Sequence, residues 1–241
     1  MTFALLGYGK MGRQIEKLLL EAGHRIVATI DNEDDWAAKM NAFRTADVAI
    51  DFSMPSVAVP NMRRCFENHI PVVVGTTGWM DQLSEMVDLC RQHDGSLIYG
   101  SNFSVGANIF VHLNRQLAEW MNHEEQYSAI LEETHHTAKK DAPSGTAITL
   151  AKALLNEVER YSQWQLSAGE QVADNILPVQ AHRIGNVHGI HQIVWHSEED
   201  DVEIKHTAHS RIGFAKGAIK AAIWLTAHPG IYDFQTIALS L

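Results

Sequence analysis

Two adjacent histidines and two adjacent lysines occur within the stretch EETHHTAKKDAPSGTA, which runs from Glu132 to Ala147. Histidine can carry a proton near neutral pH, and a lysine ammonium can attract an anion or donate a proton. The whole chain has a formal net charge of −10, so its overall field repels anions and any anionic ligand must be held by local donors. The stretch therefore indicates a site that binds an anion and transfers a proton.

The end of the same stretch predicts the start of a helix. Ser144 is a capping residue type, Pro143 suits the beginning of a helix, and the apolar run AITLAKALL follows from Ala147. The first N–H groups, those of Gly145 and Thr146 among them, would have no partner inside the helix and could bind a carboxylate. With the charge of Lys139 nearby, we expect a substrate with carboxylate groups to bind here.

His135 and His136 stand at the end of a strand predicted over YSAILEETHH, so their side chains should point in opposite directions. One ring could face the reacting centre while the other supports or binds the substrate. A metal site is a rival interpretation, but we expect none, because adjacent histidines offer no third ligand at a suitable spacing. A solvated polar loop in front of a capped helix is the plain structural alternative.

A GxGxxG pattern, formed by Gly7, Gly9 and Gly12, lies between a predicted strand and a predicted helix, which is the context that dinucleotide binding requires. Gly7 would permit a tight turn, Gly9 the approach of a pyrophosphate, and Gly12 the contact between helix and strand. Asp31 follows the second predicted strand, where a carboxylate can accept hydrogen bonds from the adenosine ribose. The carboxylate of Asp31 would repel the 2′-phosphate of NADPH and therefore favours NADH. The nearby Lys10 could attract that phosphate, so NADPH stays an alternative.

Two further loops follow predicted strands and could line the nicotinamide pocket: GTTG and GSNFSVG. Ligands of open α/β sheets bind beyond the carboxyl ends of the strands, which favours a functional role for both loops over plain turns. The expected cofactor site therefore comprises the glycine loop with its intervening residues, Asp31 and these two loops: Gly7, Tyr8, Gly9, Lys10, Met11, Gly12, Asp31, Gly75, Thr76, Thr77, Gly100, Ser101, Asn102 and Phe103.

The elements that must position these residues fall into two groups. In the first half, the short apolar runs FALL, RIVATI, DVAIDF, PVVVG and SLIYG alternate with helical patterns, which predicts a Rossmann-like, doubly wound parallel sheet of the α/β class. In the second half, helical patterns at about 108–121 and 145–161 surround strands with partial alternation, which predicts a mixed sheet. We expect a dinucleotide-binding domain from 1–103 and 211–241, and a smaller α+β domain over 104–210.

Composition limits the classes of function. With 46% hydrophobic and 20% charged residues the chain is typical of globular proteins. Its acidic balance argues against nucleic acid, and it has no apolar run of the roughly 18 residues that a membrane span needs. Cys65 and Cys90 lack CxxC spacing, which suggests reduced thiols in the cytosol. We expect a cytoplasmic protein without a nucleic-acid or membrane partner.

The glycine loop, GTTG, SNFSVG and above all ETHHTAKKDAPSGTA closely resemble the dihydrodipicolinate reductase family, and the resemblance extends to RIGNVHGIH and HSRIGFAKGA. It implies an oxidoreductase that passes hydride from NADH or NADPH to 4-hydroxy-tetrahydrodipicolinate (dihydrodipicolinate), a cyclic dicarboxylate. The product would be tetrahydrodipicolinate, in the diaminopimelate route of lysine biosynthesis. The resemblance further implies a cytoplasmic homotetramer, with substrate binding and oligomerisation in the second domain.

The resemblance also implies roles for residues of the shared motif. His135 corresponds to the family's proton donor or acceptor, and Lys139 to its proton-donating lysine. The substrate contacts would be His136, Ser144, Gly145 and Thr146.

Two alternatives stay open at this point: a non-catalytic NAD(H)-binding regulator, and another dehydrogenase of small amino or keto acids. Four histidines on or near predicted strands are expected to serve packing or an interface rather than chemistry: His188, His191, His206 and His209.

Overall fold

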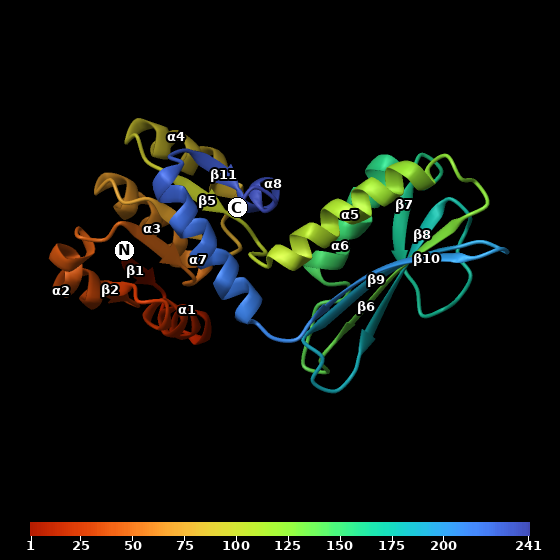
Figure 1. Cartoon of the computed structure of the whole chain (residues 1–241), viewed down its shortest axis with the longest axis horizontal. Coiled ribbons are helices and arrows are strands. Elements are labelled where there is room, and N and C mark those ends of the chain that lie inside the picture. Colours follow the sequence, from red (N-terminus) through yellow and green to blue (C-terminus); the bar gives the residue numbers. More distant parts are fainter. The chain divides into compact units, whose positions relative to one another are not determined.

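The computed structural model describes residues 1–241, and the chain divides into two compact units (Figure 1). The first unit comprises Met1–Val105 and Ile212–Leu241, and the second comprises Gly106–Arg211. No helix combines the length and the apolar character needed to cross a membrane. Both cysteines are free thiols in the interior of the first unit.

The first unit contains a six-stranded parallel sheet with the strand order β11-β5-β4-β3-β1-β2. Its strands are β1 (Thr2–Leu6), β2 (Arg25–Ile30), β3 (Val48–Asp51), β4 (Val72–Val74), β5 (Leu97–Tyr99) and β11 (Ile231–Asp233). Its helices are α1 (Lys10–Glu21), α2 (Glu33–Phe43), α3 (Pro55–Glu67), α4 (Leu83–Gln92), α7 (Ile212–Ala227) and α8 (Phe234–Ile237), with a 3₁₀ turn η1 (Met80–Gln82) before α4.

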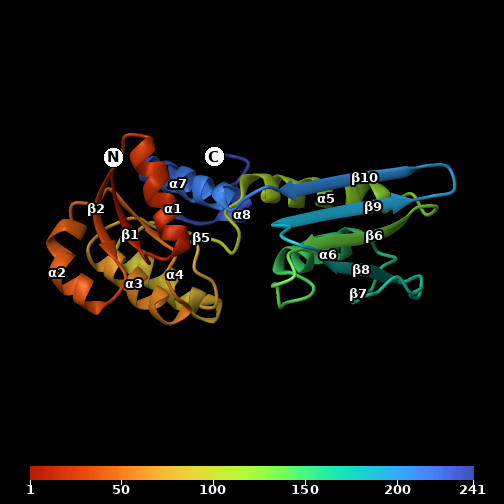
Figure 2. The same ribbon diagram turned by 90° about the horizontal axis from the view of Figure 1, so that it is seen from below.

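Helices cover both faces of this sheet (Figure 2). Helices α2, α3 and α4 pack on one face around side chains such as Trp36 and Phe66, and α1, α7 and α8 pack on the other around Ile15 and Phe234. Every residue of β3 and β4 is buried, as expected where a parallel sheet is covered on both sides. The predicted Rossmann-like, doubly wound α/β fold is therefore confirmed.

The order of strands creates a switch point between β1 and β3, where the chain reverses its direction of winding. Ligands of such sheets bind in the crevice at the carboxyl ends of the strands around this point. The glycine loop leaves β1 there, and the segment that begins with Phe52 leaves β3 beside it. The topology therefore places the glycine loop where a nucleotide would bind.

The second unit contains a five-stranded mixed sheet with the order β10-β9-β6-β8-β7. Strands β6, β8 and β7 pair in parallel, whereas β9 is antiparallel to both β6 and β10. The two helices bury their apolar side chains against one face, around Trp195, Leu131 and Val179. The elements are α5 (Val105–Met121), β6 (Ser128–His135), α6 (Gly145–Glu157), β7 (Gln163–Leu166), β8 (Ile176–Arg183), β9 (Gly189–His196) and β10 (Asp201–Ala208).

Candidate active site

The carboxyl end of β6 places charged residues in core positions. The strand alternates, so that Ala129, Leu131, Glu133 and His135 are buried on the face that packs against the helices. Only 1% of Glu133 and 8% of His135 is exposed. His136 follows directly after the strand and is half-buried, so the two neighbouring histidines have different surroundings.

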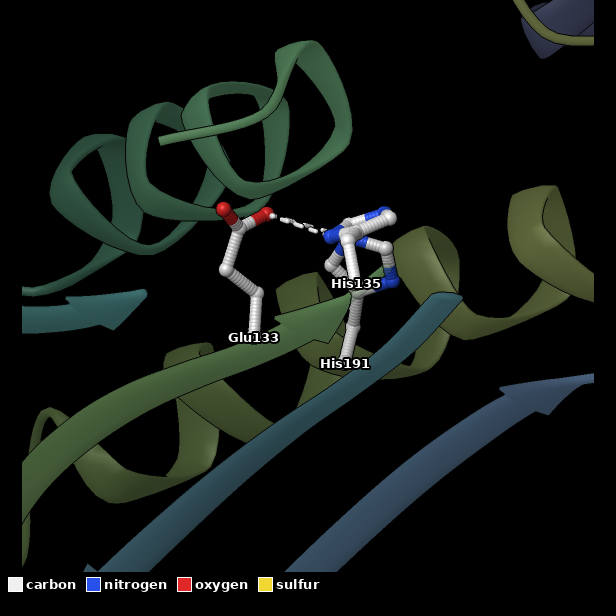
Figure 3. Close-up of side chains that lie close together, drawn as sticks. All are labelled: Glu133, His135 and His191. Atoms are coloured by element: carbon white, nitrogen blue, oxygen red, sulfur yellow. Dashed lines mark ion pairs between the residues drawn. The ribbon is translucent and has the colours of Figure 1, made fainter. Parts of the chain in front are cut away.

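His191 joins this pair from the neighbouring strand (Figure 3). The antiparallel register of β9 and β6 puts His191 opposite Glu133. Glu133 Oε2 lies 3.5 Å from His135 Nδ1 and 3.6 Å from His191 Nε2, and the two rings meet edge to face with centroids 5.1 Å apart. We expected packing or an interface role for His191, whereas the structure places it in contact with the candidate proton carrier.

Two other chain segments hold the Glu133 carboxylate by hydrogen bonds. The backbone N–H of Ser144 donates to both oxygens, at 3.0 and 3.1 Å. Arg183, at the end of β8, donates from Nη2 to Oε1 at 3.1 Å and from the same nitrogen to the carbonyl of Asp141 at 2.5 Å. Charge-assisted hydrogen bonds of this kind offset the cost of burying a carboxylate. Sequence reasoning missed Arg183 because the pairing of β8 with β6 brings it here.

The start of α6 divides the predicted substrate residues into two kinds. Ser144 is buried: its hydroxyl caps the helix by accepting from Ala147 N at 3.2 Å and lies 3.2 Å from His191 Nε2. Gly145 is exposed, and a Cβ added to it would meet no atom within 4 Å. The amides of Gly145 and Thr146 begin the helix and have no intrahelical acceptor. The open space at Gly145 suits an incoming carboxylate.

Lys139 lies in the loop between β6 and α6 and is paired with an acid. Its Nζ donates to both oxygens of Asp141, at 2.7 and 2.8 Å, and 20% of its side chain is exposed. The next residue, Lys140, is exposed. The loop thus holds one lysine in a fixed ion pair and leaves the other at the surface.

Burial sets the charge states of the two central groups. It lowers the pKa of His135 to about 4; Glu133 opposes this effect, and His191, Lys139 and Arg183 add to it. Burial would raise the pKa of Glu133, but the close approach of His191 Nε2 and the hydrogen bonds from Ser144 outweigh it and bring this pKa to about 2. At neutral pH the cluster therefore contains a neutral imidazole beside an ionised carboxylate.

These pKa values predict that the protein loses stability in acid. As pH falls below 6.5 the unfolded chain protonates His135, whereas the folded chain does so only near a pKa of about 4. Protonation of Glu133 continues this loss of stability at lower pH, from pH 4.5, the pKa of Glu133 in the unfolded chain, down to its folded pKa of about 2. For His135 alone the free energy of unfolding should fall by about 3 kcal/mol across its window. Urea unfolding at pH 7 and pH 4.5 measures the change.

The matched variants for this measurement are His135→Asn and His188→Asn, since His188 is exposed. The first should flatten the dependence on pH between 6.5 and 4, and the second should leave it unchanged. Equal urea midpoints at the two pH values in the unmodified protein would show that burial does not hold His135 neutral.

The side chains of Glu133, His135 and His191 are of types that metals use, with ligand atoms within 4.8 Å of one another. Spacing in the sequence points only to the adjacent His135 and His136, so this grouping was not predicted. The Glu133 carboxylate already accepts from the Arg183 guanidinium and the Ser144 amide, and a cation beside it would meet the positive charge of Arg183. We therefore assign no metal site.

In the first unit the three glycines of the loop have three different surroundings. Gly7 has φ +87°, and a Cβ there would lie 2.4 Å from the carbonyl oxygen of Phe52. A Cβ on Gly12 would lie 2.2 Å from the carbonyl oxygen of Gly7. Gly9 is exposed and a Cβ on it would meet nothing within 4 Å. The loop thus fits a pyrophosphate over Gly9, in front of the N-terminus of α1.

Asp31 directly follows β2 and bonds to the glycine loop. Its Oδ1 accepts from the backbone N–H of Tyr8 at 2.8 Å. The first turn of α2 adds three more acids, Glu33, Asp34 and Asp35. The Tyr8 hydroxyl donates to Glu16 in α1, which holds the ring against this helix. Two of the acids of α2 are paired with bases, Asp35 with Lys39 and Glu33 with Arg64, so Asp31 and Asp34 leave the end of β2 with a net negative charge.

In the two remaining loops, part of the predicted cofactor site faces inward. Thr76 is 8% exposed and donates to the buried Asp51 at 2.6 Å, whereas Thr77 is exposed. Phe103 is 1% exposed and its ring packs between Phe52 and Phe234. The side chains of Thr76 and Phe103 therefore support the loops, and only the backbone of these residues could reach a ligand.

Comparison with known proteins matches both units to one family. The model described as "Dihydrodipicolinate reductase, N-terminus" matches residues 1–103, and the one described as "Dihydrodipicolinate reductase, C-terminus" matches residues 106–237. The chain is 43% identical to a 4-hydroxy-tetrahydrodipicolinate reductase of Christiangramia forsetii, covering 100% of this chain and 99% of that protein. It is 33% identical to the enzyme of the same name from Methanoculleus marisnigri, over 95% of each.

A solved structure agrees at the level of the fold. The dipicolinate-bound dihydrodipicolinate reductase of Paenisporosarcina sp. TG-14 superposes with a TM-score of 0.79 at 20% identity, covering 98% of this chain and 99% of that one. A putative myo-inositol dehydrogenase of Sinorhizobium meliloti 1021 shares the fold more distantly, with a TM-score of 0.60 at 13% identity.

Proposed function

The chain belongs to the dihydrodipicolinate reductase family, and from this membership we propose that it reduces 4-hydroxy-tetrahydrodipicolinate to tetrahydrodipicolinate with NADH or NADPH. In the cell this would be a step of diaminopimelate and lysine biosynthesis. One observation carries the proposal: in the second unit a buried histidine at the end of β6, a lysine held in an ion pair and an open helix start lie around the loop that joins β6 to α6. A dicarboxylate needs such cationic and amide donors, and its reduction needs a proton carrier.

Substrate binding follows from the donors that remain accessible. We propose that one carboxylate binds the amides of Gly145 and Thr146, where the helix start also contributes partial positive charge. His136 and Lys139 would bind the rest of the dianion, and Ser144 supports the cradle by capping α6. For Lys139 the substrate would replace Asp141 as the anionic partner.

Conversion of 4-hydroxy-tetrahydrodipicolinate to tetrahydrodipicolinate adds one hydride and one proton and releases the 4-hydroxyl group as water. A bound nicotinamide cofactor would supply the hydride, and the proton would pass through His135 and Lys139. In the free protein His135 is neutral because its pKa is about 4. A bound dianion favours the charged imidazolium and raises this pKa, so His135 becomes able to hold a proton only when substrate is present. Lys139, released from Asp141, would then serve as the proton donor to the reduced substrate.

The two units would divide the work. We propose that the first binds the dinucleotide through the glycine loop, Asp31 and the GTTG and SNF loops, and that the second binds substrate. The second unit would also form a homotetramer through the sheet face that α5 and α6 leave uncovered, where Ile130 pairs with Val194 and both are half-buried. Such an enzyme would act in the cytoplasm.

A spectrophotometric assay tests the proposed function. Oxidation of NADH is followed with freshly generated 4-hydroxy-tetrahydrodipicolinate and, separately, with a panel of keto and imino acids. Turnover that is confined to the cyclic dicarboxylate supports the proposal. Turnover of a different acid would point to another small-acid dehydrogenase, and NADH binding without any turnover would point to a regulator.

The acids around Asp31 predict a preference for NADH over NADPH, because a 2′-phosphate would meet like charge. We expect kcat/KM for NADH to exceed that for NADPH by about tenfold, which corresponds to about 1.4 kcal/mol. Asp31→Asn keeps an oxygen that can accept from the Tyr8 N–H but removes the charge. It should therefore lower the ratio of kcat/KM for NADH to kcat/KM for NADPH. Asp94→Asn is the matched control, because Asp94 is exposed and lies in the turn between α4 and β5, outside this group of acids. An NADPH preference in the unmodified enzyme would contradict the prediction.

A further inference from the structure

We propose that Glu133 is a positioning residue of the reaction, because its single carboxylate orients His135 and at the same time fixes the first turn of α6. The inference rests on the proposed function and deepens it, since it assigns a role to a side chain that is buried behind the substrate cradle. Glu133 itself would contact neither substrate nor cofactor.

The carboxylate is held rigidly by groups on two other elements. The Ser144 amide binds both oxygens, and Arg183 binds Oε1 while it also holds the carbonyl of Asp141. With Glu133 on β6, Arg183 on β8 and Ser144 at the start of α6, the carboxylate joins the sheet to the loop that carries Lys139. Oε2 is left facing the two imidazole rings.

The same oxygen determines which nitrogen of His135 carries the hydrogen. An ionised carboxylate can only accept, so the nitrogen that faces it, Nδ1, must be the N–H. At 3.5 Å the contact is longer than a hydrogen bond, and this buried nitrogen has no other partner. Such contacts in ligand-free sites tighten when substrate binds. The arrangement leaves Nε2 as the nitrogen that takes up and gives up a proton.

Gly189 provides the space that Nε2 requires. A Cβ at Gly189 would lie 3.1 Å from His135 Nε2, which is closer than ordinary packing allows. The ring therefore keeps its orientation because Glu133 faces one nitrogen and a residue without a side chain lies beside the other.

The hydrogen bond to Ser144 couples this orientation to substrate binding. Because Ser144 directly precedes Gly145 and Thr146, whose amides have no intrahelical acceptor, the position of its N–H on the carboxylate fixes where those amides lie. Loss of the carboxylate should therefore disturb both proton transfer and the binding of the substrate carboxylate.

Four charged or titratable groups face His135: Glu133 on its own strand, His191 on β9, Arg183 on β8 and Lys139 in the loop. Glu133 is the one anion among them, and it is the one that favours protonation of His135. Removal of the Glu133 charge should therefore lower the pKa of His135. Where the titration of His135 controls the dependence of activity on pH, that part of the curve should move to lower pH.

The test compares Glu133→Gln with the matched control Glu159→Gln. Glu159 loses the same charge from an exposed turn that follows α6 in the same unit, away from the uncovered face of the sheet. For Glu133→Gln we expect a kcat lower by about 10- to 100-fold, the scale known for partners that orient metal-bound histidines, together with a higher KM and a displaced pH profile. Glu159→Gln should match the unmodified enzyme in all three. Melting temperatures of both variants measure any general loss of stability.

A purely structural role would lower the melting temperature without moving the pH profile, and that result would overturn the proposal. So would an unchanged kcat. If Glu133→Gln does not fold, Glu133→Asp replaces it, because aspartate keeps the charge but withdraws it from His135. In that variant kcat should fall and the pH profile should move to lower pH, because the anion that favours protonation of His135 lies farther from the ring. An unmoved profile would overturn the proposal for this variant too.

The test also separates this inference from the proposed function. If the unmodified protein does not turn over the cyclic dicarboxylate, the proposed function has failed. Glu133 is then judged by the NMR titration of His135 in the unmodified protein and in Glu133→Gln, with the signal assigned from His135→Asn. A lower midpoint in Glu133→Gln supports the coupling, and an equal midpoint refutes it.

Discussion

Lys139→Ala is expected to lower kcat for 4-hydroxy-tetrahydrodipicolinate by about 100-fold or more, the scale on which general acids contribute to catalysis. The ammonium group would supply both a proton and attraction for the substrate dianion, and alanine retains neither. NADH binding should be unaffected, because the glycine loop lies in the other unit of the chain. Steady-state kinetics together with fluorescence titration of NADH measure the two effects separately.

Lys140→Ala is the matched control for this variant. It removes the same charge one residue away, from a side chain that is exposed. Its kcat should lie close to that of the unmodified enzyme. If both variants lost activity equally, the effect would come from the net charge of the loop, and Lys139 would have no individual role as proton donor.

Gly7→Ala is expected to destabilise the first unit by about 3 kcal/mol or more. A side chain at φ +87° is strained in itself, and its Cβ would lie 2.4 Å from the Phe52 carbonyl, so β1 and β3 would have to separate at their ends. Denaturant unfolding measures the loss. An unfolding midpoint equal to that of the unmodified protein would show that the loop adapts.

For Gly9→Ala, two residues further along the loop, we expect the opposite result: little change in stability but weaker binding of the cofactor. Its Cβ would enter open space, so stability should change little, but the methyl group would occupy the position expected for the pyrophosphate. KM for NADH should therefore rise by at least about tenfold, or about 1.4 kcal/mol. If Gly9→Ala bound NADH normally, the cofactor would have to lie elsewhere.

Most of the fold followed from the sequence because buried parallel strands leave short apolar runs between helices. The elements that escaped prediction lack this signal. In α2 only Trp36 and Phe43 are buried, so its sequence shows little helical periodicity. Strand β7 is mostly exposed, and β11 is a three-residue strand at the sheet edge that gains its hydrogen bonds from β5, far away in the sequence.

The candidate site was predictable where it is local. His135, Lys139 and the start of α6 are close together in the chain, and capping chemistry alone located the helix start. His191 and Arg183 could not be predicted as members of the site, because their contacts with Glu133 depend on the registers in which β9 and β8 pair with β6. For Thr76 and Phe103 the loop was located from the sequence, but the burial of their side chains was not. Whether a loop side chain points into the core depends on tertiary packing.

The pair formed by Lys139 and Asp141 has a consequence for how affinity responds to ionic strength. Since the ammonium already has an anionic neighbour, substrate capture there is an exchange of one counter-charge for another. Added salt weakens the departing contact as well as the arriving one, so the two screening effects partly cancel. Substrate affinity should consequently depend on salt less steeply than the charge of a dianion suggests, and Asp141→Asn should steepen that dependence.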